Sequence, residues 1–167
     1  MKRWWQVLLV ILSIIILDQL TKLGMRQNFF LGESVPMIDG LFNLTYVRNK
    51  GAAFGFGAGY HDLFRVVMFL ALPVAACVWL GFLIKASLLV NRLQTASYTL
   101  ILAGAVGNLI DRFYLGYVVD MFDFYWGPHH FPAFNIADSS ISIAAALLFL
   151  DYFLTWRRER QSASAKQ

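Results

Sequence analysis

Charged residues and cysteine are both scarce in this sequence. Asp, Glu, Lys and Arg together make up 14% of the 167 residues, whereas a soluble domain carries about 25% in order to cover itself with a hydrated surface. Apolar residues make up 59%, and the mean hydropathy is +0.58. A chain of this composition has to place much of its surface against lipid, so we predict an integral membrane protein.

The single cysteine, Cys77, lies in an apolar run. One cysteine rules out an intramolecular disulfide, and it rules out cysteine-based zinc sites, which need several thiolates at set spacing. The sequence also lacks a Gly-x-Ser-x-Gly nucleophile motif and a glycine-rich phosphate loop. His61, His129 and His130 could form a two-histidine metal site, but no carboxylate accompanies them at a supporting spacing. We therefore expect no metal and no other cofactor.

Four stretches are apolar and long enough to cross a bilayer, which takes about 20 residues. They are residues 4–23, 63–84, 96–113 and 136–156. The first resembles a signal peptide, because Lys2 and Arg3 precede it, but no small-x-small cleavage site follows, so we expect it to be retained. We predict an all-α membrane domain over residues 1–160, a four-transmembrane-helix bundle, followed by a flexible polar tail over residues 161–167.

Lysine and arginine gather in segments that these spans would place on one side of the membrane, and such residues favour the cytoplasmic side. They precede the first span, lie between the second and third, and follow the fourth, whereas residues 115–135 contain none. Arg26, Arg48 and Lys50 weaken this bias without reversing it. We predict that both termini are cytoplasmic. The net charge of +4 then reflects topology, and we expect no nucleic-acid partner.

The two longer segments expected on the outer side have different patterns. Residues 42–48 alternate with the period of two that is typical of a half-buried strand, which predicts a small extracytoplasmic β-sheet. Residues 121–134 are rich in aromatic side chains. Because aromatic rings favour the headgroup zone, we expect this segment to dip into the membrane surface or to cap it.

Acidic and polar residues gather near the outer ends of the predicted spans. The acids are Asp18, Asp111, Asp120, Asp123 and Asp138, and the polar residues near them are Lys22, Asn108, Arg112 and Asn135. A charged side chain at mid-bilayer costs roughly 2.5–3.5 kcal/mol, and less near the interface. Five acids at one level therefore indicate a functional site.

Each of these residues also has a structural explanation. Asp18 and Lys22 have the i, i+4 spacing of an ion pair. Asp111 and Arg112 could anchor a helix at the interface. Asp120 and Asp123 could be ordinary loop acids. Asp138 is placed like a residue that caps a helix N-terminus, and on spacing alone we favour that role for it.

A pair of these acids could perform hydrolysis. Two carboxylates held close together cannot both ionise easily, so they share a proton. The ionised member can deprotonate a water molecule while the protonated member donates to a substrate carbonyl. Such a pair cleaves a peptide bond without a metal or a covalent intermediate. Spacing does not identify which two of the five acids would form it.

Five motifs, in order along the chain, resemble those of the lipoprotein signal peptidase (signal peptidase II) family. They are DQLTK (18–22), VRNKGAAFG (47–55), GAVGNLIDR (104–112), GYVVDM (116–121) and FNIADSS (134–140). The resemblance covers nearly the whole chain, and it implies that Asp120 and Asp138 are the catalytic pair. One small departure is Met121, where phenylalanine is commoner in the family, and this apolar exchange does not affect the chemistry.

The resemblance also implies supporting roles around the pair. By analogy, Asn108 and Asn135 orient the acids, Asn49 and Arg112 hold the substrate backbone or its headgroup region, and Asp18 fixes the first helix against the site. The implied substrate is a bacterial prolipoprotein whose cysteine carries diacylglyceryl, cut just before that cysteine. The implied protein is a monomer in the inner membrane, in contact with membrane lipid, with its site near the extracytoplasmic face.

Two other classes of function remain open on sequence grounds. A small ion- or proton-coupled transporter could use intramembrane acids as a relay. However, these acids lie at one face, and the sequence has no internal repeat of the transporter kind. A non-catalytic assembly factor could use the same polar groups to hold its helices together.

Overall fold

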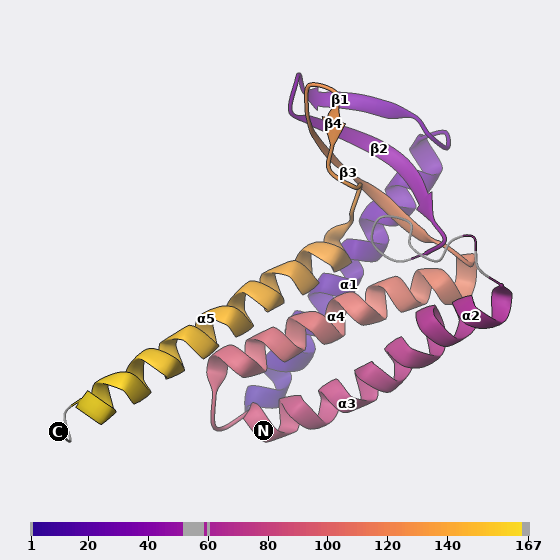
Figure 1. Ribbon diagram of the computed structural model, residues 1–167. Coiled ribbons are helices and arrows are strands. Elements are labelled where there is room, and N and C mark those ends of the chain that lie inside the picture. Colours follow the sequence, from indigo (N-terminus) through magenta and orange to yellow (C-terminus); the bar gives the residue numbers. More distant parts are fainter. Residues whose placement is uncertain (1, 52–58, 60, 165–167) are drawn as a thin grey trace.

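The structure is a computed structural model that describes residues 2–51, 59 and 61–164. Figure 1 shows a small sheet standing at one end of a bundle of long helices. In chain order, the elements are α1 (Lys2–Asn28), β1 (Ser34–Ile38), β2 (Phe42–Asn49), α2 (Asp62–Val66), the π-helical turn η2 (Val67–Ala71), α3 (Leu72–Ser87), α4 (Arg92–Leu115), β3 (Val118–Trp126), β4 (His129–His130) and α5 (Ile136–Ser164).

Four helical stretches among the described residues are long and apolar enough to cross a membrane, which confirms the four predicted spans. They are Arg3–Asn28, Leu63–Ser87, Arg92–Leu115 and Ile136–Ser162. The helices extend beyond the predicted bounds, because their polar end turns continue past the apolar run. Helix α5 reaches Ser164, four residues into the stretch expected to be a tail, while residues 165–167 lie outside the described part of the chain.

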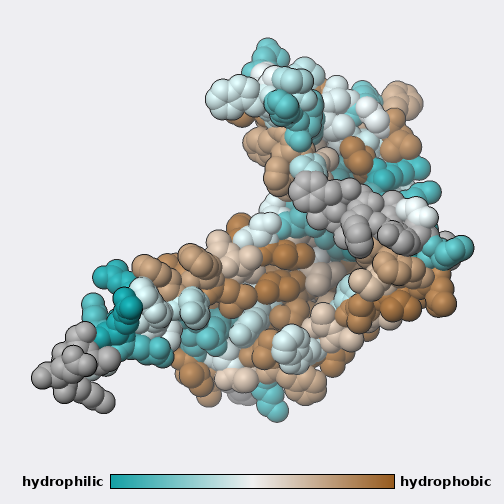
Figure 2. All heavy atoms as spheres, viewed as in Figure 1, coloured by the Kyte–Doolittle hydropathy of each residue, from teal (hydrophilic) through white to brown (hydrophobic). Residues whose placement is uncertain are grey.

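The surface of the bundle is suited to lipid. Large apolar side chains such as Leu9, Phe82 and Phe149 are about two-thirds exposed, at 67%, 66% and 70%. Figure 2 shows apolar residues covering the helices, with hydrophilic residues gathered on the sheet and near the end of α5. The first residues of α1 and the last turns of α5 both lie away from the sheet (Figure 1), as an even number of crossings requires.

Helix α4 is central, because it contacts α1, α3 and α5. Two glycines allow this close packing. A Cβ atom at Gly104 would collide with the carbonyl oxygen of Ala137 in α5, and one at Gly107 would lie 2.8 Å from Oδ2 of Asp18 in α1. Small residues are a general device for bringing membrane helices together.

The turn after α4 leads the chain directly into strand β3. Gly116 adopts a left-handed conformation with φ of 75°, and its N–H bonds to the carbonyl oxygen of Arg112. This is a common helix C-terminal arrangement, and glycine adopts it without steric cost. Strand β3 begins two residues later at Val118. The polar residues of the last turns of α4 and those of β3 are therefore neighbours.

The sheet has four antiparallel strands in the order β1-β2-β3-β4. Strand β2 confirms the strand predicted at residues 42–48. The aromatic segment 121–134, expected to dip into the membrane surface or to cap it, is mostly strand: β3 pairs with β2, and β4 folds back on β3. Its rings stack within the sheet, for example Phe124 on Phe134 with centroids 5.9 Å apart. Aromatic residues favour strands as well as membrane interfaces, and pairing with β2 stabilises the strand conformation of this segment.

Candidate active site

Asp120 is the third residue of β3, opposite Val47 of β2. Its side chain is only 2% exposed. Each carboxylate oxygen accepts a hydrogen bond from an amide: Oδ1 from Asn135 Nδ2 at 2.7 Å, and Oδ2 from Asn49 Nδ2 at 3.1 Å. Two amides from two different segments therefore fix the orientation of this carboxyl group.

Asp138 lies in the first turn of α5 and forms a capping box with Asn135. The N–H of Asp138 donates to Asn135 Oδ1 at 2.9 Å, and Asp138 Oδ2 accepts from the N–H of Asn135 at 3.3 Å. Such a reciprocal pair satisfies N–H groups that the helix leaves without partners. The capping role favoured from spacing is therefore confirmed. The other oxygen, Oδ1, accepts from Asn108 Nδ2 at 2.8 Å.

Asn135 connects the two acids. It is fully buried, its side-chain NH2 bonds to Asp120, and its backbone N–H and side-chain oxygen bond to Asp138. Both carboxyl groups line one cavity of about 550 Å³. The fold therefore brings together two acids that lie on different elements.

The cavity that holds the acids has polar and apolar parts. Its polar lining includes Asn49, Asn108 and Arg112 in addition to the two acids. Its apolar lining includes Phe131, Phe134, Ile141 and Ile143. A cavity of this kind suits a ligand that has both a hydrogen-bonding backbone and apolar substituents.

The environment of Asp120 favours a shared proton. Burial raises the pKa of Asp120 from its ordinary value of 3.8 to about 7, and the nearby carboxyl of Asp138 adds to this rise. Hydrogen bonds from Asn49 and Asn135, together with the charge of Lys22, oppose it in part. Near neutral pH the pair can therefore hold one proton between its two members.

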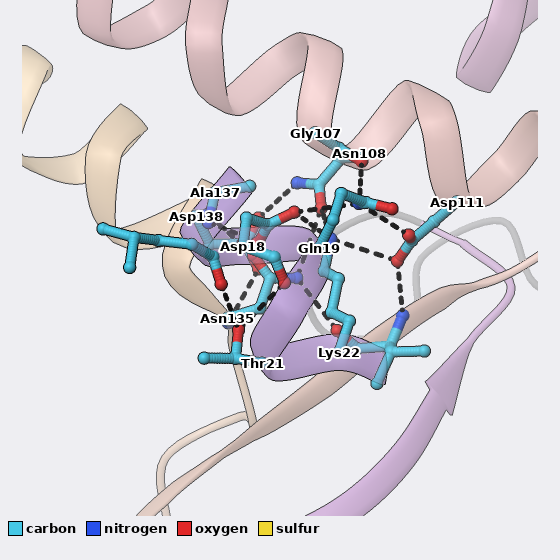
Figure 3. Close-up of polar contacts among 12 residues, drawn as sticks. Asp18, Gln19, Thr21, Lys22, Gly107, Asn108, Asp111, Asn135, Ala137 and Asp138 are labelled. Atoms are coloured by element: carbon cyan, nitrogen blue, oxygen red, sulfur yellow. Dashed lines mark hydrogen bonds and ion pairs between the residues drawn. The ribbon is translucent and has the colours of Figure 1, made fainter. Parts of the chain in front are cut away.

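Lys22 lies at the centre of a second polar cluster beneath the acids, and Figure 3 shows it among its partners. It is 2% exposed. Its Nζ lies 2.8 Å from Asp18 Oδ2 and 3.0 Å from Asp111 Oδ2. The i, i+4 pair predicted from sequence is confirmed, and α4 contributes a second carboxylate to it. Lys22 also donates to Asn108 Oδ1 at 3.0 Å, and Asn135 Nδ2 donates to the same oxygen at 3.2 Å. These two bonds direct the NH2 of Asn108 toward Asp138.

The two acids of this cluster also bond to backbone N–H groups. Asp18 Oδ1 accepts from the N–H of Ala137 in α5 at 2.9 Å, and Asp111 Oδ2 accepts from the N–H of Val119 in β3 at 3.0 Å. Gln19 Nε2 lies 3.2 Å from Asp18 Oδ2 and 3.0 Å from Asp111 Oδ1. These bonds connect α1, α4, α5 and the first residues of β3 around the site.

Arg112 and Asn49 lie at the side of the cavity nearest the segment after β2. Arg112 Nη2 donates to the carbonyl oxygen of Gly51 at 3.0 Å, and its guanidinium lies over the ring of Phe69 at 5.6 Å. Asn49 donates to Asp120, so its amide orients the acid in addition to lining the cavity. Residues 52–55 of the family-like motif 47–55 lie outside the described part of the chain.

Asp123 is separated from the site. It is 7% exposed, and its carboxylate accepts from Asn43 Nδ2 at 3.0 Å and lies 2.8 Å from His130 Nδ1. These contacts lie within the sheet, and Asp123 does not line the cavity of Asp120 and Asp138. The structure therefore distinguishes the two loop acids, which residue-level reasoning could not.

Three contributors to the two clusters were missed from sequence. Gln19 lies between the charged residues Asp18 and Lys22 in the sequence, and its spacing from them does not indicate a role in the cluster. The N–H groups of Ala137 and Val119 carry no side-chain signal at all.

Asp151, a carboxylate inside the fourth span, lies outside both clusters and was not predicted to have a role. It accepts from Asn91 Nδ2 at 2.8 Å and from Gln94 Nε2 at 2.9 Å, and so connects α5 to the start of α4.

Taken together, the fold and the site define a class: a small, multi-pass membrane protein with a buried, amide-held pair of carboxyl groups beneath a sheet at one end of its bundle. A family model described as signal peptidase (SPase) II matches residues 10–154. The chain belongs to the signal peptidase II family of aspartic-type peptidases, and it is a multi-pass protein of the bacterial inner membrane.

Curated relatives carry the name of this family, and a solved bacterial membrane enzyme has a similar fold. The lipoprotein signal peptidase of Syntrophus aciditrophicus (strain SB) is 45% identical over 83% of this chain and 86% of its own length. That of Shewanella halifaxensis (strain HAW-EB4) is 43% identical over 99% of this chain and 94% of its own. A solved bacterial membrane enzyme, determined by the in meso method at 2.3 Å resolution, is 32% identical and superposes with a TM-score of 0.78, covering 89% of this chain and 87% of that one.

Proposed function

We propose that this protein removes the signal peptide from diacylglyceryl-modified prolipoproteins, cutting just before the lipid-bearing cysteine, and that Asp120 and Asp138 activate the attacking water. The observation that carries the mechanism is the double attachment of Asn135, which bonds to both carboxyl groups in one cavity. The names of the relatives support the substrate class.

The reaction uses the proton that the pair shares. The ionised carboxylate takes a proton from water as the water oxygen attacks the scissile carbonyl carbon, and the protonated carboxyl donates to the carbonyl oxygen. The tetrahedral intermediate then collapses. The carbon–nitrogen bond breaks as the leaving nitrogen takes the proton that the first carboxylate received from water. One hydroxyl of the intermediate returns its proton to the other carboxylate as the product carbonyl forms, so one proton again remains between the two acids. The raised pKa of Asp120, about 7, makes it the member that holds the proton near neutral pH.

The surrounding residues have distinct tasks in this proposal. Asn49, Asn108 and Asn135 keep the carboxyl groups oriented through the hydrogen bonds described above. Arg112, at the side of the cavity, binds a substrate carbonyl or headgroup oxygen. The apolar lining accommodates the apolar parts of the substrate, which enters sideways from the membrane. Asp18 holds α1 against the start of α5 through Ala137.

We further propose that the site faces the extracytoplasmic side and that the protein acts as a monomer surrounded by membrane lipid. The bias of lysine and arginine supports this orientation. The first residues of α1 and the last turns of α5, which carry much of that positive charge, lie away from the sheet and the acids (Figure 1).

The test compares single substitutions in purified protein, with a synthetic diacylated precursor as substrate. Asp120→Asn and Asp138→Asn should each lower kcat by about 10²- to 10⁴-fold, the usual contribution of a general acid or base. Asp123→Asn is the matched control, because it makes the same chemical change on the same strand as Asp120 but outside the cavity. A chelator should leave the wild-type rate unchanged.

The same experiment separates the rival functions. Normal turnover by the Asp120→Asn or Asp138→Asn protein, when folded and inserted, would remove the catalytic assignment. A protein without peptidase activity that conducts protons or ions in vesicles would be a transporter. One that does neither but is needed for assembly of another membrane protein would be an assembly factor.

A further inference from the structure

A second cavity, of about 560 Å³, lies between α1 and α4 at the end of the bundle away from the sheet. Figure 1 shows the start of α1 beside the turn that joins α3 to α4. A hydrogen bond of 2.9 Å from Arg3 Nη1 to the carbonyl oxygen of Leu88 in that turn agrees with this placement. None of the catalytic groups proposed above lines this cavity.

The lining changes from cationic to apolar with depth. Arg3 from α1 and Arg92 from α4 both lie at helix ends, whereas Val7, Val10 and Leu100 lie further along the same helices. At 1.5 Å rise per residue, Val10 is about 10 Å and Leu100 about 12 Å from the arginine of its own helix. The cavity therefore has two guanidinium groups near the bilayer surface and an apolar wall toward the bilayer core.

The positive charge of this cavity is not neutralised by its own lining. No acidic side chain is among the described residues that line it. Asp151, which approaches the start of α4 from α5, has its two oxygens bonded to Asn91 and Gln94. A guanidinium has five N–H donors, so the bond from Arg3 to Leu88 leaves donors available to a ligand while it fixes the position of the side chain.

We propose that this cavity binds one anionic phospholipid, with its phosphate between Arg3 and Arg92 and its acyl chain along Val7, Val10 and Leu100. Guanidinium groups bind phosphate oxygens through paired hydrogen bonds, and basic pockets between membrane helices are a general binding site for anionic headgroups. The lipid comes from the leaflet on the side away from the sheet, which is the cytoplasmic leaflet in the orientation proposed above.

Such a lipid would stabilise the position of α1. It contacts α1 and α4 at the end opposite to the Lys22 cluster, which joins the same two helices through Asp18 and Asp111. Helix α1 would then be attached to α4 at both ends. This inference concerns binding and stability, and it does not depend on the catalytic proposal.

The first experiment uses the full-length wild-type protein, stripped of lipid in detergent. It is exposed to equal amounts of phosphatidylglycerol and phosphatidylcholine with identical acyl chains, and retained lipid is counted by native mass spectrometry. We expect one phosphatidylglycerol per chain to be retained in preference to phosphatidylcholine. Equal retention of the two lipids would overturn the proposal, because the guanidinium groups would then not select the headgroup. Displacement of the lipid by millimolar inorganic phosphate alone would reduce the site to a phosphate-ion site.

The second experiment tests the two arginines. The R3Q/R92Q protein should bind phosphatidylglycerol about 25-fold more weakly, since each cation close to an anionic headgroup contributes about a fivefold difference in affinity. The R157Q/R158Q protein is the matched control. It loses the same two charges from the last turns of α5, outside the cavity, and should bind like the wild type. Equal weakening in both proteins would indicate a general charge effect and would overturn the site, and unchanged binding in R3Q/R92Q would do the same.

Discussion

The buried lysine of the cluster beneath the acids allows a quantitative prediction. Lys22 lies 2.8 Å from one carboxylate oxygen and 3.0 Å from another. At an effective dielectric constant of 20, each attraction amounts to about 6 kcal/mol. The cost of burying the ammonium group offsets much of this, so the net effect of removing only the lysine is about 3–5 kcal/mol, as for other buried ion pairs.

We therefore expect Lys22→Met to lower the free energy of unfolding by about 3–5 kcal/mol, because Asp18 and Asp111 are left facing each other without a cation. Adding Asp18→Asn removes one of these two charges. The double variant should be more stable than Lys22→Met alone, with a coupling of about 0.5–3 kcal/mol between the two positions. The surviving folded protein should also have a lower kcat, because Asn108 Oδ1 keeps only the donor from Asn135 and its NH2 is held less firmly toward Asp138.

The assay is reversible unfolding in mixed detergent–SDS micelles, with peptidase turnover measured on the folded fraction. Lys85→Met is the control, since it makes the same chemical change at an exposed position in the last turn of α3, and surface changes of this kind stay within about 0.5 kcal/mol. A loss below about 1 kcal/mol in Lys22→Met, or strictly additive effects in the double variant, would contradict the electrostatic account of this cluster.

The remaining predictions concern pH dependence, helix packing at Gly107 and the contacts of Asp151. Turnover should fall as the pH rises through about 7, where Asp120 loses the shared proton. The raised pKa of Asp120 also stabilises the fold fully below pH 3.8, and this contribution is lost as the pH rises to about 7, so Asp120→Asn should remove that part of the pH dependence of unfolding. Gly107→Ala should destabilise the protein by about 1–3 kcal/mol in unfolding assays, because its Cβ meets Asp18, whereas Gly81→Ala, which meets nothing within 4 Å, should not. Asp151→Ala should cost about 1–3 kcal/mol in the same assay, because Asn91 and Gln94 lose their shared acceptor.

The membrane spans could be predicted from the sequence because hydropathy alone decides which segments enter lipid. Their ends could not, since the polar last turn of α1, which ends at Asn28, carries no apolar signal. The strand within the aromatic segment 121–134 could not be predicted for a related reason. Its strand character depends on pairing with β2, where Asn43, opposite Asp123, lies about 80 residues earlier in the chain. A local pattern does not contain that information.

The sequence predicted that five acids lie close together. It did not predict that Asp120 and Asp138 share a cavity while Asp18 and Asp111 bind Lys22. Asp120 and Asp123 are three residues apart, so on a strand they point to opposite faces. This rule would have separated them if residues 118–126 had been predicted as a strand. The i, i+4 spacing of Asp18 and Lys22 predicted their ion pair correctly. The arrival of Asp111 and Asn108 at the same lysine depends on the packing of α1 against α4, which follows only from the fold.

The capping box at the start of α5 has a consequence for inhibitors of this protein. The Asp138 side chain cannot turn away from its present direction without giving up the hydrogen bond that its Oδ2 accepts from the N–H of Asn135. A compound that relied on turning this acid aside would have to offset the loss of that bond. Rigid molecules shaped to the resting position of both acids should therefore bind more tightly than flexible ones that demand adjustment from the protein.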